Sequence, residues 1–490
     1  MSVVVLDVGS SSIRSSIVTN DAKVKAVASV PLTINHEGLS QIEYDANALA
    51  KSAMFVLEEA IASHPTQLEG LAITTQRATS VLWSRSHIKA LAPAISWQDL
   101  RTTATCLSLG TKGVAIAPNE SGTKYAYLLN HQLLKEDPAD VALGTLDSWL
   151  AFYLGVGHIT DITNVAMSGL TTKDITGYDP LRLEALQIER HYLPAITASY
   201  GELGVAKRLS AELPLLSLVG DQQASLFGQH CHSSTCAKVT LGTGVMIDVN
   251  LGTEPPNFER RGRNGSYRVP SLGSKKAILW GVEGALLSGG SSLQWFCNTF
   301  LDGAPPAEVD RYAAQADTSD GCIFVPALSG LATPDWDFGA RGVFLGVSRD
   351  SGRNELSDAL LRGIAHSVAD IVEAIEDDTS KTIEILRVDG KMAGSTVLLQ
   401  HIADYAGVKV QLSTEIEATS LGAGMLAHLA LEGIDAHSAY DDECSYRYKV
   451  AYDPKICKGS KRHDDIRQRW QQAKALSRSQ IPALSQVKFQ

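Results

Sequence analysis

The chain has 490 residues, of which 44% are hydrophobic and 20% charged, and its net charge is −11. The composition is typical of a globular protein, and the acidic balance argues against a nucleic-acid or anionic-membrane partner. The length exceeds the size at which one hydrophobic core stops growing, so we expect two large domains. No apolar run reaches the roughly 18 residues of a membrane-spanning helix, and we recognise no signal peptide. Seven cysteines at irregular spacing favour reduced thiols, which predicts a cytoplasmic protein.

A hairpin with a glycine and hydroxyl turn opens the chain. Residues 3–6 form an apolar run typical of a buried strand, Asp7 ends it, and residues 17–18 belong to the returning strand. Between them, Gly9 and the three serines at 10–12 make a turn whose N–H groups and hydroxyls can bind an anion. A carboxylate at the strand end can hold a hydrated Mg²⁺, which prefers oxygen ligands. The alternative is an ordinary hairpin with a solvated aspartate.

Two further segments of the first half carry polar side chains suited to a ligand. After a strand at 24–32 and a helix at 46–64, the strand 68–75 is followed by Arg77, and ligands of open α/β sheets usually lie at such strand ends. The segment 93–102 then brings Trp97 close to an amide, a carboxylate and a guanidinium, which suits a hydroxyl-rich ligand. The alternatives are a surface arginine on a loop and a half-buried core tryptophan.

A second strand end carries a carboxylate. After a polar turn expected at 160–164, residues 215–219 form an apolar strand, and Asp221 lies where the following helix begins. The partial positive charge of a helix N-terminus helps to keep such a carboxylate ionised. Asp221 could therefore take the proton of a hydroxyl as that oxygen attacks phosphorus. The alternative is an N-cap aspartate.

The second half repeats the opening pattern. Residues 237–241 form a strand, the turn 242–244 is Gly-Thr-Gly, and residues 245–249 return, which suggests a duplicated pair of domains facing one cleft. We therefore expect domains at 1–235 and 236–490. Strands and helices alternate to the end of the chain, so the class is α/β. A long amphipathic helix at 356–375, an Ala/Gly-rich helix suited to close packing after Glu417, and a polar surface helix at 463–477 are expected. The tract 230–236 holds two histidines and two cysteines too closely spaced for a zinc ribbon, and we expect no metal there.

Taken together, these motifs identify a family. The chain resembles the FGGY carbohydrate kinases, and within them the glycerol kinases, over residues 3–430. The resemblance implies two actin-like (ribonuclease H-like) ATPase domains flanking a central cleft, with the substrate and the base in the first domain and the nucleotide in the second. The segments that carry it include LDVGSSSIRS, ITTQRATSVLW, PAISWQDLRT, SGTK, GDQQASLFGQ, LGTG, VEGALLSGGSSLQW, LRVDG and EATSLGAG.

The resemblance also implies roles for individual residues. Asp221 matches the catalytic base, and Asp7 together with Asp221 is expected at Mg²⁺. The residues expected to bind ATP lie in turns and helix starts of both domains: Ser10, Ser11, Arg14, Gly242, Thr243, Gly290, Gln294, Gly390 and Lys391. The residues expected to contact the substrate are Arg77, Ala78, Trp97, Asn119 and Gln222.

Four positions depart from the glycerol kinase pattern. Ala78 stands where a glutamate is usual, and Asn119 stands where an aromatic residue is usual. Because these groups clamp a three-carbon polyol, their loss weakens the grip on a small substrate and makes room for a larger one, unless Asp99 compensates. Lys391 replaces a glycine and Ser395 an asparagine on the adenosine side.

The predicted function is ATP-dependent phosphorylation of glycerol or a close polyol analogue, with Mg²⁺, by an enzyme that binds neither nucleic acid nor membrane. The resemblance is compatible with a homodimer. One alternative is a kinase for a tetritol or ketopentose such as erythritol, ribulose or xylulose. An alternative of another class is an actin- or chaperone-like ATPase without a small-molecule acceptor. A third is a sugar-binding regulator without catalysis, which the presence of both carboxylates disfavours.

Overall fold

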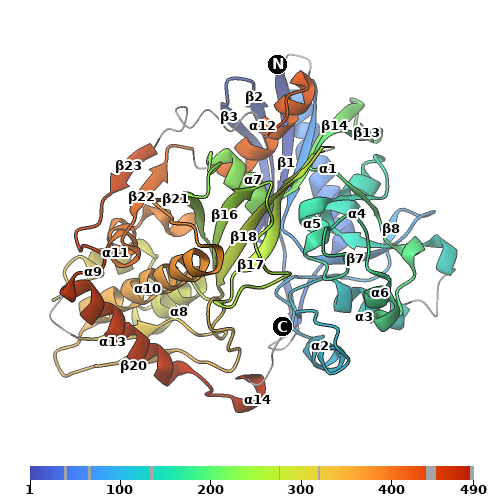
Figure 1. Ribbon diagram of the computed structural model, residues 1–490. Coiled ribbons are helices and arrows are strands. Elements are labelled where there is room, and N and C mark those ends of the chain that lie inside the picture. Colours follow the sequence, from blue (N-terminus) through green and yellow to red (C-terminus); the bar gives the residue numbers. More distant parts are fainter. Residues whose placement is uncertain are drawn as a thin grey trace.

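The computed structural model consists of two lobes built around two large sheets (Figure 1). It describes residues 1–37, 41–64, 68–132, 137–274, 276–317, 321–415, 417–436 and 448–485. In Figure 1, the blue and blue-green elements belong to one lobe and most of the orange and red elements to the other, and strands of both large sheets lie in the middle of the view. Within the described residues, no helix is long and apolar enough to cross a membrane.

The sheet of the N-terminal lobe begins with the predicted hairpin. Its six strands are, in spatial order, β13 (Tyr200–Ala206), β14 (Leu213–Gly220), β6 (Gly70–Thr75), β1 (Ser2–Val8), β2 (Ser12–Thr19) and β3 (Val24–Pro31). Strand β1 is buried throughout and pairs antiparallel with β2 and parallel with β6, which pairs parallel with β14. The carboxyl ends of β1, β6 and β14 therefore lie along one edge of the sheet.

The sheet of the C-terminal lobe repeats this arrangement. Its seven strands are β17 (Tyr267–Gly273), β18 (Ile278–Leu286), β16 (Val245–Gly252), β15 (Cys236–Leu241), β21 (Ile385–Asp389), β22 (Lys409–Ser413) and β23 (Tyr448–Tyr452). Here too an antiparallel hairpin, β15–β16, pairs in parallel with the next strand, β21, which pairs in parallel with β22. The repeated hairpin predicted from the sequence is confirmed.

Smaller sheets and helices complete the two lobes. The remaining strands are β4 (Asn35–Glu37), β5 (Gln41–Tyr44), β7 (Ser80–Ser84), β8 (Lys89–Ala90), β9 (Ala94–Ile95), β10 (Val141–Thr145), β11 (Ile159–Asp161), β12 (Ala195–Thr197), β19 (Ile323–Val325) and β20 (Val343–Leu345). The helices are α1 (Ala46–Ser63), α2 (Thr103–Gly110), α3 (Gly122–Gln132), α4 (Leu146–Tyr153), α5 (Ile162–Ala166), α6 (Pro180–Leu186), α7 (Asp221–Gly228), α8 (Gly290–Phe300), α9 (Ala307–Ala313), α10 (Arg353–Thr379), α11 (Thr396–Ala406), α12 (Ala418–Glu432), α13 (Lys461–Ser477) and α14 (Pro482–Ser485).

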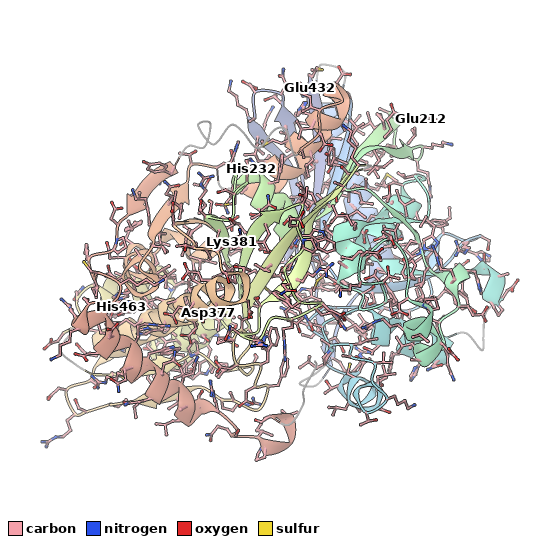
Figure 2. All side chains as sticks on the ribbon, in the orientation of Figure 1. Glu212, His232, Asp377, Lys381, Glu432 and His463 are labelled. Carbon is pink, nitrogen blue, oxygen red and sulfur yellow. The ribbon has the colours of Figure 1, made fainter. Side chains whose placement is uncertain are left out.

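Helix α12 comes late in the chain but packs on the N-terminal lobe. Its Leu421 and Leu426 share a core cluster with Val3 of β1. A Cβ atom added to Gly422 would lie 1.8 Å from the carbonyl oxygen of Ala224, so α12 and α7 touch backbone to backbone. The close packing predicted for this Ala/Gly-rich helix is confirmed. Figure 2 shows Glu432, the last residue of α12, at the same end of the molecule as Glu212, which precedes β14.

One prediction of secondary structure is wrong. The segment expected as a polar turn at 160–164 forms the end of β11 and most of α5, because Asp161 caps the helix by accepting from the N–H groups of Thr163 and Asn164. Helix α13 lies on the surface, as predicted, and most of its residues are exposed. Its inner face is nevertheless anchored, because Trp470 is fully buried, stacks on His366 and donates to Asp370 of α10 at 2.9 Å.

Candidate active site

Three charged residues lie at the strand ends of the N-terminal sheet. Asp7 is in β1, Arg77 follows β6, and Asp221 follows β14 at the first position of α7. Because these strands are parallel, their ends meet at the cleft edge, and Arg77 Nε lies 4.0 Å from Asp221 Oδ1. Asp7 and Arg77 are buried, so the alternatives of a solvated aspartate and a surface arginine are wrong.

The surroundings of the two carboxylates disfavour their ionised forms. Burial raises the pKa of Asp221 to about 6, although the positive charges of Arg77 and Lys238 lower it, and the negative charge of Asp7 adds to the increase. Burial likewise raises the pKa of Asp7, against the opposing effect of Arg14, which donates to it at 2.6 Å. Two carboxylates in electrostatic contact favour an added cation, because it relieves their repulsion.

The donor set around these aspartates is small. Among the described residues, no group of three or more histidine, cysteine, aspartate or glutamate side chains could hold a metal ion. Magnesium is usually bound in phosphoryl-transfer sites by one or two carboxylates, water and the substrate phosphates, without a cage made of protein alone. Asp7 and Asp221 therefore fit Mg²⁺ held together with a nucleotide.

The C-terminal lobe supplies charged groups that the sequence reasoning missed. Lys238 of β15 contacts Asp248 of β16 at 2.8 Å and also donates to Gln222. Glu283 of β18 lies opposite Asp248 in the sheet and accepts from Arg77 at 2.5 Å across the two lobes. Each of the three strands is otherwise almost entirely apolar. The sequence offered one signal for these residues, a charged residue inside an otherwise apolar strand, because a buried charge needs a partner.

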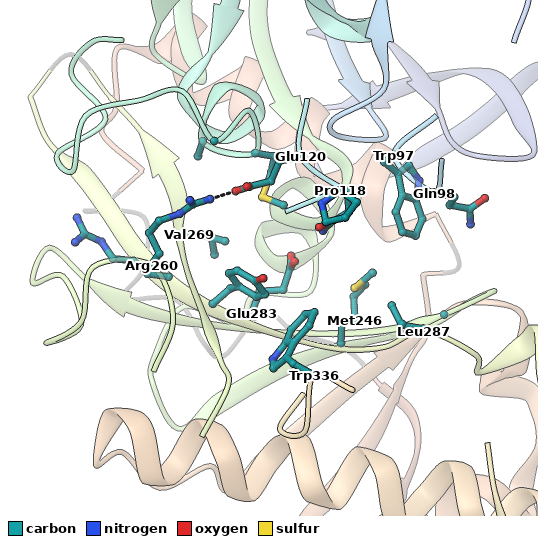
Figure 3. Close-up of a pocket in the computed structure, with 18 of the residues that line it drawn as sticks. Trp97, Gln98, Pro118, Glu120, Met246, Arg260, Val269, Glu283, Leu287 and Trp336 are labelled. Carbon is teal, nitrogen blue, oxygen red and sulfur yellow. Dashed lines mark hydrogen bonds and ion pairs between the residues drawn. The ribbon is translucent and has the colours of Figure 1, made fainter. Parts of the chain in front are cut away.

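A cavity of about 480 Å³ opens between the lobes (Figure 3). Of the residues predicted to contact substrate, Trp97 and Asn119 line it. Arg77 and Gln222 are not among the described lining residues: Arg77 donates to Glu283, which lines the cavity, and Gln222 accepts from Lys238. Members of both lobes contribute to the wall, including Gln98, Pro118, Glu120, Met246, Arg260, Val269, Glu283, Leu287 and Trp336.

Ala78 and Asp99, which the sequence singled out, are not among the described residues that line the cavity. Ala78 is buried with a φ of 60°. Asp99 is fully buried and accepts from Arg101 and from the N–H group of Ile42 at 2.7 Å. The carboxylate of Asp99 is thus already occupied, and it does not replace a missing substrate ligand.

One of the two predicted phosphate-binding turns, between β15 and β16, belongs to the C-terminal lobe. In the β15–β16 turn, Gly242 accepts from the N–H group of Gly290 at 2.9 Å, and a Cβ atom at Gly290 would lie 2.5 Å from that oxygen. Thr243, which lines the cavity, accepts from the N–H group of Ser291 at 3.1 Å. The turn is thereby fixed on the N-terminus of α8, whose first two N–H groups donate to the carbonyl oxygens of the turn.

The other residues expected at ATP are distributed around these turns. Ser10 and Ser11 lie in the β1–β2 turn, and Arg14 in β2 bridges Asp7 and Glu417. Gln294 is exposed on α8, and Gly390 and Lys391 are exposed after β21. Their roles at a nucleotide stay predictions.

Comparison with known proteins decides the family. Models for the N-terminal and C-terminal domains of the FGGY family of carbohydrate kinases match residues 2–228 and 237–431. The chain belongs to this family. It is 32% identical to the glycerol kinase of Aliivibrio fischeri over 88% of each chain, and 32% identical to that of Citrifermentans bemidjiense over 96% of this chain and 98% of the relative. The FGGY protein described here is thus a phosphotransferase that acts on a sugar or polyol.

Solved structures agree on the fold of this FGGY kinase. Plasmodium falciparum glycerol kinase with ADP has a TM-score of 0.84 at 24% identity, covering 97% of this chain and 98% of that one. Xylulose kinase from Lactobacillus acidophilus also has a TM-score of 0.84, at 18% identity, and covers 99% of both chains. The predicted fold of two actin-like ATPase domains is confirmed. The division at residue 235 stays a prediction.

Proposed function

We propose that this FGGY kinase transfers the γ-phosphoryl group of ATP to a hydroxyl of glycerol or a related small polyol, with Asp221 as the general base. The observation that carries the proposal is the placement of Asp221 at the start of α7, 4.0 Å from Arg77, which donates to Glu283 of the cavity lining. A base with a pKa of about 6 is ionised at neutral pH and is still basic enough to accept a proton in the transition state.

Each of the residues around Asp221 has a separate role in the reaction. The Asp221 carboxylate accepts the proton of the acceptor hydroxyl as that oxygen attacks phosphorus, and Arg77 fixes its position from the side. Asp7 and Asp221 would hold Mg²⁺, which, when bound, neutralises charge on the phosphates. The Gly242–Thr243 turn on α8 supports the phosphate side through its fixed backbone. Most of the acceleration then comes from positioning in a site closed to water.

One measurement distinguishes the kinase from the ATPase alternative. We expect the rate of ADP release from Mg-ATP, monitored with a coupled assay, to depend on the presence of an acceptor. The acceptors to compare are glycerol, dihydroxyacetone, erythritol, pentitols, ribulose and xylulose. Removing Mg²⁺ with EDTA should abolish turnover, and adding it back should restore it. ADP release at the same rate without any acceptor would contradict the proposal and favour the ATPase. The cysteines, which form no disulfide among the described residues, support our placement of the enzyme in the reducing cytoplasm.

A further inference from the structure

An ion pair between the two lobes forms part of the cavity wall. Glu120, in the loop before α3, pairs with Arg260, in the segment between β16 and β17, and both line the cavity (Figure 3). Glu120 is only 5% exposed, and its other carboxylate oxygen accepts from the N–H group of Ala117 at 2.6 Å. Arg260 also donates to the carbonyl oxygen of Ala115. The two side chains are therefore held in fixed positions before any ligand arrives.

The place of this pair in the cavity separates it from the reacting groups. Figure 3 shows Glu120 and Arg260 on one side of Glu283, and Trp97 with Gln98 on the other. Glu283 accepts from Arg77, which in turn lies beside Asp221, so the proposed base is connected to the lining at Glu283, between these two groups. An acceptor that lies against Glu283 can therefore extend along the cavity toward the ion pair.

Most charges at this end are paired with an opposite charge. Glu120 and Arg260 compensate each other, as do Lys173 with Glu259 at 2.8 Å and Arg182 with Asp179 at 3.4 Å, whereas Arg268 donates to the carbonyl oxygen of Lys173 at 2.8 Å. A carboxylate or phosphate on the acceptor would meet the negative charge of Glu120 beside the positive charge of Arg260. A hydroxyl both donates and accepts, so it can bond to both partners, and hydrogen bonds to charged groups are the stronger kind.

We propose that the Glu120–Arg260 pair is a specificity site that binds the remote hydroxyl groups of a neutral acceptor longer than three carbons. This inference rests on the proposed kinase function and specifies its substrate class. It agrees with the small residue at Asn119, next to Glu120, where an aromatic wall would shorten the cavity. The pair also joins the two lobes, so a test must separate substrate recognition from lobe closure.

Substrate recognition can be separated from lobe closure by one ratio, that of kcat/KM for a five-carbon acceptor to kcat/KM for glycerol. A defect in closure affects both acceptors alike and leaves this ratio unchanged. We expect the wild type to favour xylitol, ribitol, ribulose or xylulose over glycerol. Glu120→Gln should lower the ratio by roughly 10-fold or more, the size expected for a hydrogen bond to a charged group. The double variant Glu120→Gln with Arg260→Gln keeps the shape without charge and should lower it similarly, which covers the case that the single variant fails to fold.

The pair Lys276–Asp435 provides a matched control. It joins the β17–β18 connection of the C-terminal lobe to the segment after α12, neither residue is among the described lining residues, and the Lys276 side chain is 80% exposed, so Lys276→Met should leave the ratio within about twofold. Equal losses for glycerol and the longer acceptor in the Glu120 variants would overturn the specificity site. A wild type that favours glycerol would also overturn it while supporting the kinase function. A wild type that phosphorylates no acceptor would contradict the kinase function itself.

Discussion

Replacing Asp221 by asparagine should destroy activity and, at neutral pH, stabilise the fold. The raised pKa of about 6, compared with the ordinary 3.8, means that folding favours the protonated form of this side chain. That contribution to stability is fully present below pH 3.8 and is lost as the pH rises through 6. Asparagine resembles the protonated form at every pH. Two pKa units correspond to about 3 kcal/mol, so Asp221→Asn should be more stable than the wild type by at most about 3 kcal/mol at pH 7 and equal to it near pH 3.5.

The assay combines thermal unfolding from pH 4 to pH 8 with acceptor-dependent ADP release. In the wild type, kcat/KM should fall as the pH drops through about 6, because the base becomes protonated. In Asp221→Asn, turnover should fall by a factor of roughly 10² to 10⁴. Asp147 is a matched control: burial raises its pKa to about 6 as well, but it accepts from Thr160 and lies outside the cavity lining, so Asp147→Asn should retain turnover. Substantial turnover in Asp221→Asn, or a variant less stable than the wild type at pH 7, would refute the reasoning.

Three further variants test other parts of the structure. Lys124 is fully buried, and burial lowers its pKa to about 7. Lys124→Met should therefore raise the free energy of unfolding at pH 7 by roughly 1–4 kcal/mol, and it should abolish the increase in stability that the wild type shows from pH 7 to 10. Chemical denaturation at several pH values checks this. Trp470→Ala should lower the free energy of unfolding by about 3–5 kcal/mol, and a loss below 1 kcal/mol in urea titrations would show that α13 is not anchored by this side chain. Gly290→Ala should push α8 away from Gly242 and raise the KM for ATP more than the KM for the acceptor, and unchanged nucleotide kinetics would contradict a nucleotide role for this turn.

The sequence predicted most of the architecture because its signals are local. Apolar runs that end in a glycine and hydroxyl turn specify a hairpin in both lobes, and the parallel strands then bring their ends together at one edge. The sequence could therefore place Asp7, Arg77 and Asp221 at the ends of strands, since each lies at or shortly after the end of an apolar run.

The missed features depend on contacts between distant segments. Glu283 meets Arg77 from the other lobe, and Arg260 meets Glu120 from 140 residues away, so neither partner reveals the other in the sequence. The sequence of α13 does not reveal its anchored face, because Trp470 and Lys474 donate to Asp370 of α10, which lies 100 and 104 residues away from them. Local periodicity cannot report such pairing, which is decided by tertiary structure.

The packing of α12 on the N-terminal lobe has a consequence for how the cleft can open. The chain passes between the lobes after α7, again before α12, where Arg14 pairs with Glu417 at 2.7 Å, and once more between α12 and β23. The first two passages leave the N-terminal lobe close together, because α12 and α7 are in backbone contact at Gly422. Two passages at one place favour rotation of the lobes over sliding, so we expect the same side chains to meet again each time the cleft closes.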